Sequence, residues 1–117
     1  MSVLVAVAAG PEGAAALAAG VAEADLLGTD LVVVNLTLDP LGPVPAASAV
    51  LERDGPGDRD PVDAVLDEIA ERGDVARLVI GLRRRSRVSK ALLGSVSQRL
   101  LLDSPVPVLA VKPEGSA

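Results

Sequence analysis

The order of apolar runs along this chain predicts an α/β fold, in which a mainly parallel sheet carries helices on both faces. Continuous aliphatic runs are typical of strands buried on both sides. Runs of this kind lie at Val3–Val7, Leu31–Leu36, Ala76–Ile80 and Val106–Val111. Segments with helical periodicity alternate with them. Because parallel strands need crossover connections, this alternation favours strands joined through helices.

The composition limits what the protein can do. Its 117 residues suit a single domain spanning 1–117, and half of them are hydrophobic. Phe, Tyr, Trp, His and Cys are absent, which excludes imidazole bases, thiol nucleophiles, disulfides and the usual zinc sites. We therefore expect no enzyme and assign no catalytic or metal-binding residue, although weak ATP hydrolysis by positioned phosphate and water stays open. The short amino-terminal apolar run suits neither a signal peptide nor a membrane span, so a cytoplasmic protein is expected.

Two helices are marked by their terminal residues. The first is expected to begin at Pro11 and to stop at Gly28. Its predicted buried face consists of Ala14, Leu17, Ala18 and Val21. The second follows an Asp60 N-cap and ends at Gly73. Its predicted buried stripe consists of Val62, Val65, Leu66 and Ile69.

The middle of the chain is predicted to be a loop. Residues 39–48, DPLGPVPAAS, contain three prolines, and proline disfavours a helix interior. A short strand is expected at 49–53, followed by a turn at 54–59. Parallel crossovers usually need about a dozen residues or more, so the sequence leaves open how this third strand joins the sheet.

The stretch VIGLRRRSRVSKALLGSV, Val79 to Val96, carries the main indication of function. A strand ends at Gly81, and Gly94-Ser95 opens a last helix expected at Ser95–Asp103. A helix N-terminus offers unpaired N–H groups and a positive dipole, which suit phosphate. Between them lie five of the chain's 11 basic residues, in a chain with 16 acids: Arg83, Arg84, Arg85, Arg87 and Lys90. The alternatives are an ordinary helix cap and a solvated basic loop.

The segment from Gly81 to Lys112 resembles the carboxyl-terminal signature of the universal stress protein family. That family's nucleotide motif is Gly, two residues, Gly, nine residues, Gly and then Ser or Thr, which Gly81 and Gly94-Ser95 match in spacing. LLGSVSQRLL and PVPVLAVKP also resemble the family's last helix and strand. The likeness is looser in the first third of the chain. It fails in the middle, where the family usually has a helix.

The resemblance implies a Rossmann-like sheet of the adenine nucleotide alpha hydrolase type, with five strands in the order 3-2-1-4-5 and a truncated second helix. It implies ATP or AMP as ligand, with adenine beside Leu36 and Ile80 and ribose beside Gly81. The phosphates would lie at Gly94, Ser95 and Val96. From the turn and the basic loop we add Ser97, Arg83 and Arg84 as phosphate-binding candidates.

Two residues depart from the family pattern. Ala8 stands where ATP-binding members have an Asp that contacts the adenosine, and Arg84 stands at the second glycine of the motif. An arginine there blocks close approach of the backbone to ribose but adds a charge that can reach phosphate. We therefore expect weaker ATP binding than in members that keep both residues.

The last strand predicts a homodimer. It is apolar on both faces, and Pro107 places it at a sheet edge. An exposed apolar edge is an aggregation hazard unless it is covered, for example by its own copy. The expected interface consists of Val106, Val108, Leu109, Ala110 and Val111. The resemblance implies the same, because family members commonly dimerise by antiparallel pairing of this strand.

Three functions remain open from the sequence. The first is a stress-protein-like regulator that binds a nucleotide or another phosphate-type anion without rapid turnover. The second is a homodimeric interaction module of the same fold without nucleotide. The third, nucleic-acid binding through the arginine loop, is disfavoured by the pI of about 4.6 and by the lack of aromatic residues. No membrane partner is expected.

Overall fold

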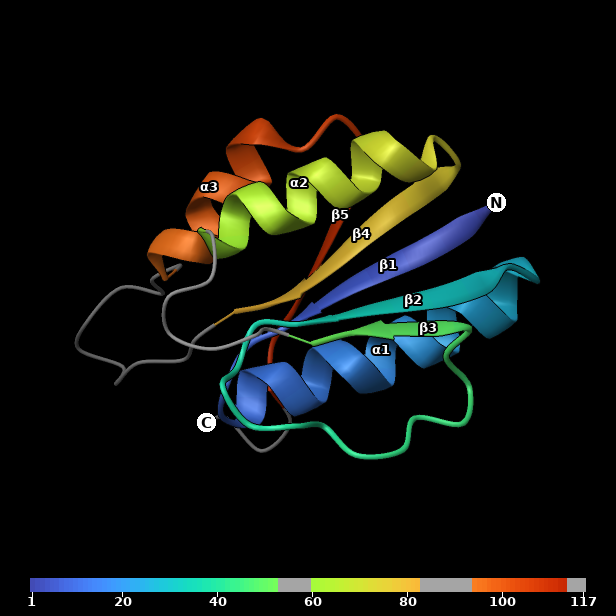
Figure 1. The fold of residues 1–117 in the computed structure, drawn as a ribbon, viewed down its shortest axis with the longest axis horizontal. Helices are drawn as coiled ribbons and strands as arrows, with labels where there is room; N and C mark the ends of the chain where they lie inside the picture. The colour runs from blue at the N-terminus through green and yellow to red at the C-terminus, as the bar shows by residue number, and fades with distance from the viewer. Residues whose placement is uncertain (53–59, 83–93, 114–117) are drawn as a thin grey trace.

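The computed structural model describes residues 1–52, 60–82 and 94–113, and these form one parallel sheet with three helices (Figure 1). The elements are β1 (Ser2–Val7), α1 (Pro11–Leu27), β2 (Asp30–Asn35), β3 (Ala49–Leu51), α2 (Pro61–Arg72), β4 (Val75–Gly81), α3 (Ser95–Asp103) and β5 (Val108–Val111). The strand order is β3-β2-β1-β4-β5, and each neighbouring pair is parallel. The predicted α/β class and the order 3-2-1-4-5 are confirmed.

The helices divide between the two faces of the sheet, α1 on one side and α2 with α3 on the other (Figure 1). Alternate residues of β1 pack into the cores on the two faces of the sheet. Val3, Val5 and Val7 pack in the α1-side core, whereas Leu4 and Ala6 pack in the α2-side core. The strand is continuously aliphatic because side chains alternate across a sheet and both faces are covered.

The predicted buried face of α1 is only partly right, because Leu17 and Val21 pack against the α1-side core but the fully buried residues are others. The structure instead buries Gly13, Ala16, Gly20 and Ala24. Of the predicted set, Ala14 and Ala18 are exposed, and Leu17 and Val21 are half-buried. A Cβ on Gly13 would lie 1.7 Å from the carbonyl oxygen of Ala8, and one on Gly20 would lie 3.0 Å from Val5 Cβ. The smallest residues face the sheet because the helix lies so close to it, and this distance outweighs side-chain hydrophobicity.

The helix α2 forms as predicted. The side chain of Asp60 accepts hydrogen bonds from the backbone N–H groups of Val62 (2.8 Å) and Asp63 (3.4 Å), and Gly73 ends the helix at φ 68°. Val62, Val65 and Ile69 are buried, and Leu66 packs against the same core. The predicted turn at 54–59 lies outside the described residues.

The loop 36–48 joins β3 to the sheet. The Ser48 N–H donates to the carbonyl oxygen of Leu31 at 2.8 Å, and β3 then pairs with β2 in parallel from Ala49 to Leu51. Leu41, Val44 and Ala47 pack against the α1-side core. A loop with these apolar contacts therefore runs beside α1 and leads the chain to β3 (Figure 1).

The last strand begins later than predicted. The backbone N–H and C=O of Val106 both bond to the hydroxyl of Ser104, so Val106 precedes β5 and does not belong to it. Pro107 accepts a hydrogen bond from the Leu78 N–H at 2.9 Å. The strand lies at the sheet edge, as predicted. Within the described ranges, no helix combines the length and the apolarity needed to cross a membrane.

Candidate functional site

The carboxyl ends of β2, β1 and β4 form one edge of the sheet. The order of strands along the chain reverses beside β1, which lies between β2 and β4. In open parallel sheets, ligands bind beyond the strand ends at such a position. The N–H of Leu36 donates to the carbonyl oxygen of Val7 at 2.8 Å, and Gly81 is the last residue of β4. Two predicted site residues therefore lie at this edge.

Three apolar candidates meet on the α2 side of that edge. Ile80 is a member of the α2-side core, and Leu36 and Val96 are half-buried side chains that pack against the same core. Ile80 is 1% exposed, so its side chain mainly fills the core. Its predicted contact with adenine, like that of Leu36, stays a prediction.

The first turn of α3 is tied to the end of β4. The hydroxyl of Ser97 donates to the carbonyl oxygen of Gly81 at 3.1 Å. Gly94 is the N-cap residue, so no side-chain hydrogen bond caps the start of the helix. Ser95, the first residue of the helix, is exposed. The first intrahelical bond runs from the Gln98 N–H to the Gly94 carbonyl. The N–H groups ahead of Gln98 therefore have no acceptor within the helix, and no acid in the first turn offsets the dipole.

Gly81 also has a packing role that sequence reasoning missed. A Cβ at this position would lie 2.1 Å from the backbone oxygen of Glu12. The amino end of α1 therefore crosses the end of β4 at a distance that only glycine permits. The glycines at positions 13 and 20 within a helical pattern were the available signal for this close approach.

Comparisons with known proteins identify the family. The model of the universal stress protein family matches residues 56–112. A universal stress protein of Mycolicibacterium smegmatis is 39% identical over 129 residues, which cover 97% of this chain and 98% of that protein. This chain belongs to the universal stress protein family. The predicted family is thus confirmed.

Two solved structures share the fold of this universal stress protein. A universal stress protein in complex with cAMP superposes with a TM-score of 0.68 at 22% identity, covering 97% of each chain. The universal stress protein from Archaeoglobus fulgidus in complex with dAMP gives a TM-score of 0.65 at 22% identity, covering 96% of this chain and 98% of that one. At this identity the likeness establishes the architecture.

The charged residues of this universal stress protein are placed only in part. Arg83 and Arg84, with the rest of the basic loop, lie outside the described residues. Three arginines that are described have acidic partners: Arg72 with Glu68, Arg77 with Glu23, and Arg99 with Asp60. The first pair lies within α2, the second links β4 to α1, and the third links α3 to the N-cap of α2. None of these arginines is among the predicted phosphate-binding residues.

Two acids have a lowered pKa in the folded protein. Hydrogen bonding from the Val62 backbone N–H, followed by the neighbouring Arg99, lowers the pKa of Asp60. The amino-terminal ammonium group, 3.3 Å away, lowers the pKa of Asp74. The first acid caps α2, and the second precedes β4 at the opposite end of that strand from Gly81. Within the described ranges, no group of three or more acids could hold a metal ion.

Asn35 is a second residue that sequence reasoning missed. It is fully buried at the end of β2, and its amide nitrogen donates to the Asp39 carbonyl at 2.8 Å and to the Glu52 carboxylate at 2.6 Å. Its amide oxygen accepts from the Thr37 N–H at 2.9 Å. One side chain therefore positions the loop after β2 and links it to the end of β3. An Asn that interrupts an aliphatic strand was the signal.

Proposed function

We propose that this universal stress protein is a small regulatory protein that binds a nucleotide or another phosphate-type anion between Gly81 and Ser97, without rapid turnover. The bond from Ser97 to Gly81 is the observation that carries the proposal, because it places the amino end of α3 at the carboxyl end of β4. A phosphate there would accept hydrogen bonds from the N–H groups of Ser95 to Ser97, which have no acceptor within the helix, and would meet the positive end of the helix.

Two further observations support a nucleotide as the ligand. The fold is shared with one structure in complex with cAMP and another in complex with dAMP. Leu36 and Val96 provide partly exposed apolar surface on the same side of the sheet as α3, which suits a purine. We propose AMP or ATP as the ligand class, with the predicted contacts of Arg83 and Arg84 to its phosphates.

The proposed ATP affinity is lower than in relatives that keep the Asp and the second glycine. Ala8 offers no carboxylate to the adenosine, and an arginine at the second glycine position of the motif would hinder close approach of the backbone to the ribose. The charge of Arg84 compensates partly by attracting phosphate.

Calorimetric titration with AMP and ATP tests this function. We expect binding that is weakened by Ser95→Ala and by Arg84→Glu, and that survives the control reversal Lys112→Glu at the end of β5. Native mass spectrometry of the purified protein would show any nucleotide already bound. Tight ATP binding that neither site variant changes would contradict the placement, and the absence of binding by every phosphate ligand would leave the interaction module as the function.

The second candidate function is a homodimeric interaction module, and the edge strand β5 is the observation that favours it. The carbonyl oxygen of Pro107 accepts a hydrogen bond from Leu78 of β4, and that of Val111 accepts one from Leu82, just after β4. The alternation of a parallel ladder therefore turns the backbone groups of Val108 and Ala110 away from the sheet. Leu109 and Val111 are half-buried against the α1-side core, and Val108 against the α2-side core. We propose that a second copy pairs with this edge in antiparallel fashion and covers these side chains.

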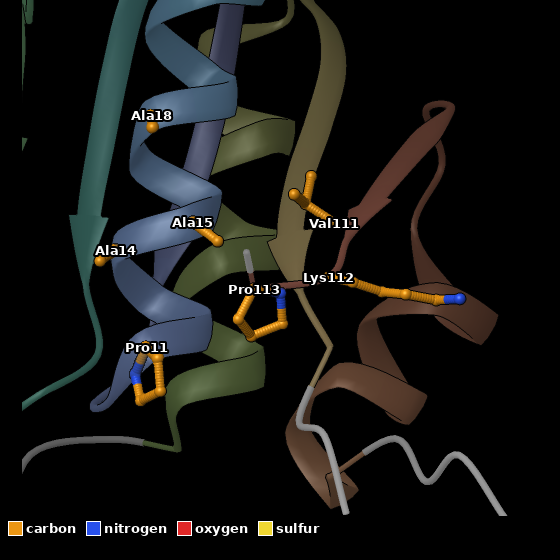
Figure 2. Close-up of a pocket in the computed structure, with 7 residues that line it drawn as sticks. All are labelled: Pro11, Ala14, Ala15, Ala18, Val111, Lys112 and Pro113. Atoms are coloured by element: carbon orange, nitrogen blue, oxygen red, sulfur yellow. The ribbon is translucent and has the colours of Figure 1, made fainter. Parts of the chain in front are cut away.

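A groove beside this edge supports the same proposal. It has a volume of about 490 Å³ and lies between α1 and the end of β5 (Figure 2). Pro11, Ala14, Ala18, Val111 and Pro113 supply apolar surface. Figure 2 shows Lys112 extending away from α1, so its charge does not occupy the groove. A partner strand at the β5 edge would bring further apolar side chains next to this surface. We also propose a cytoplasmic location and a role in the stress response.

A further inference from the structure

A hollow between α1 and the loop 36–48 lies toward the end of the sheet opposite the phosphate turn. Its volume is about 370 Å³, within the range of small-molecule sites. Thr29 comes just before β2 and Leu31 is the second residue of that strand, and both line the hollow. Gly81 and the amino end of α3 lie at the carboxyl ends of the parallel strands. The hollow is therefore separate from the candidate nucleotide site.

The hollow lies where a loop covers the sheet in place of a helix. The connection from β2 to β3, all of which is described, contains no helix and runs beside α1 (Figure 1). Parallel sheets are usually covered by helices on both faces, so the loop leaves space against α1. The walls of this space are apolar and mostly small, and they suit an aliphatic ligand. They consist of Ala18, Val21, Ala22 and Ala24 from α1, Leu31 from β2 and Ala46 from the loop.

One polar group beside the hollow is buried and unpaired. The hydroxyl of Thr29 has no hydrogen-bond partner within the described part of the chain, whereas its backbone N–H donates to the carbonyl oxygen of Ala24 at 2.9 Å. Buried hydroxyls are normally paired, because an unpaired one destabilises the fold. Rotation of the Thr29 side chain to another staggered position breaks no hydrogen bond. The hydroxyl is therefore available to a ligand in the hollow.

The end of α1 beside the hollow carries negative charge. Asp25 lines the hollow and is exposed, and its carboxylate has no hydrogen bond or ion pair among the described residues. The last turn of α1 contains no basic residue to offset the negative end of the helix dipole. The described lining residues include no Lys or Arg. The N–H of Gly28 donates to the carbonyl oxygen of Asp25 at 3.2 Å, which orders the turn that joins Asp25 to Thr29.

We propose that this hollow binds a small primary amine with an aliphatic body. The ammonium group donates hydrogen bonds to the carboxylate of Asp25 and to the hydroxyl oxygen of Thr29, and the aliphatic body lies against Val21 and Leu31. An ammonium group has three donors and no acceptor, so it matches one charged and one neutral acceptor. A phosphate or carboxylate ligand is disfavoured by the negative charge. The site goes beyond the function proposed above and does not depend on it.

The test is an NMR titration of the ¹⁵N-labelled protein at neutral pH with cyclohexylamine, which is protonated there, and with cyclohexanol as the uncharged analogue of the same shape. Cyclohexylamine should shift the amide signals of Val21, Asp25 and Thr29 in a saturable way, and cyclohexanol should bind more weakly. Asp25→Asn should weaken cyclohexylamine about tenfold, the effect of losing one charge-assisted hydrogen bond. Asp63→Asn, at an exposed acid on α2, is the matched control and should leave the affinity unchanged.

Thr29→Val tests the second contact, because valine keeps the shape and removes the hydroxyl. It should weaken cyclohexylamine about two- to tenfold, the range for one neutral hydrogen bond. The unliganded variant should unfold at the same temperature as wild type or higher, because the hydroxyl has no partner to lose.

Three results would overturn the proposal: affinity for cyclohexylamine that is the same in Asp25→Asn and wild type, affinity that is the same in Thr29→Val and wild type, or equal affinity for cyclohexylamine and cyclohexanol. Amide shifts at Gly94 and Ser97 in place of Thr29 would also overturn it, since they would put the amine at the phosphate turn.

Discussion

The hydroxyl of Ser97 on α3 donates to the carbonyl oxygen of Gly81 at the end of β4, at 3.1 Å. The bond joins the two ends of the Gly81-to-Ser95 motif at one edge of the sheet. The two serines of this turn therefore differ in role. The Ser97 hydroxyl is bonded to the protein, whereas Ser95 is exposed and could contact a ligand.

Replacing Ser97 by alanine should lower the free energy of unfolding by about 0.5–1.5 kcal/mol, the net value of one hydrogen bond. Urea denaturation followed by far-UV circular dichroism measures this, since the chain lacks Trp and Tyr fluorescence. Ser95→Ala is the control and should keep the stability while weakening phosphate ligands. Equal stability of the two variants would mean that the Ser97 bond contributes nothing in solution.

Gly81→Ala should destabilise the protein by about 1–3 kcal/mol or more, because the new methyl group meets backbone and not a flexible side chain. The Cβ would lie 2.1 Å from the oxygen of Glu12. Gly94→Ala, where a Cβ meets nothing within 4 Å, should cost only about a few tenths of a kcal/mol. Thermal unfolding of both variants compares them, and a Gly81→Ala protein as stable as wild type would rule out the close crossing of α1 over β4.

Asp60 should make stability depend on pH in the acid range. Its pKa is lowered in the folded protein below the ordinary value of an aspartate, chiefly by the hydrogen bond from the Val62 N–H. The carboxylate therefore stabilises the fold above the unfolded pKa, and this contribution is lost as the pH falls through the lower folded pKa. Asp60→Asn keeps an N-cap without the charge. Its unfolding temperature should approach that of wild type as the pH falls below about 4, and a constant gap between the two proteins across that range would contradict the assignment.

Leu109→Lys should convert the proposed dimer to a monomer, because a buried ammonium at the β5 edge is costly without a partner. Sedimentation at tens of micromolar, a generous concentration for an interface of about standard size, measures the change. Leu26→Lys, at a side chain 78% exposed near the end of α1, is the matched control and should stay dimeric. A wild-type protein that sediments as a monomer of 11.8 kDa would end the proposal.

The sequence by itself determined the class of fold, the strand order with the help of the family motif, and the helix α2 with its Asp60 cap. These features depend on local signals: aliphatic runs, proline and glycine at helix ends, and motif spacing. The tertiary structure decided which face of α1 is buried. Gly13 and Gly20 are buried because the helix passes close to Ala8 and to Val5 of β1, and not because of their hydrophobicity. It also decided how the loop 36–48 joins β3, through Asn35 and a few apolar contacts. Such contacts join residues far apart in the chain, and no local pattern records the distance between them.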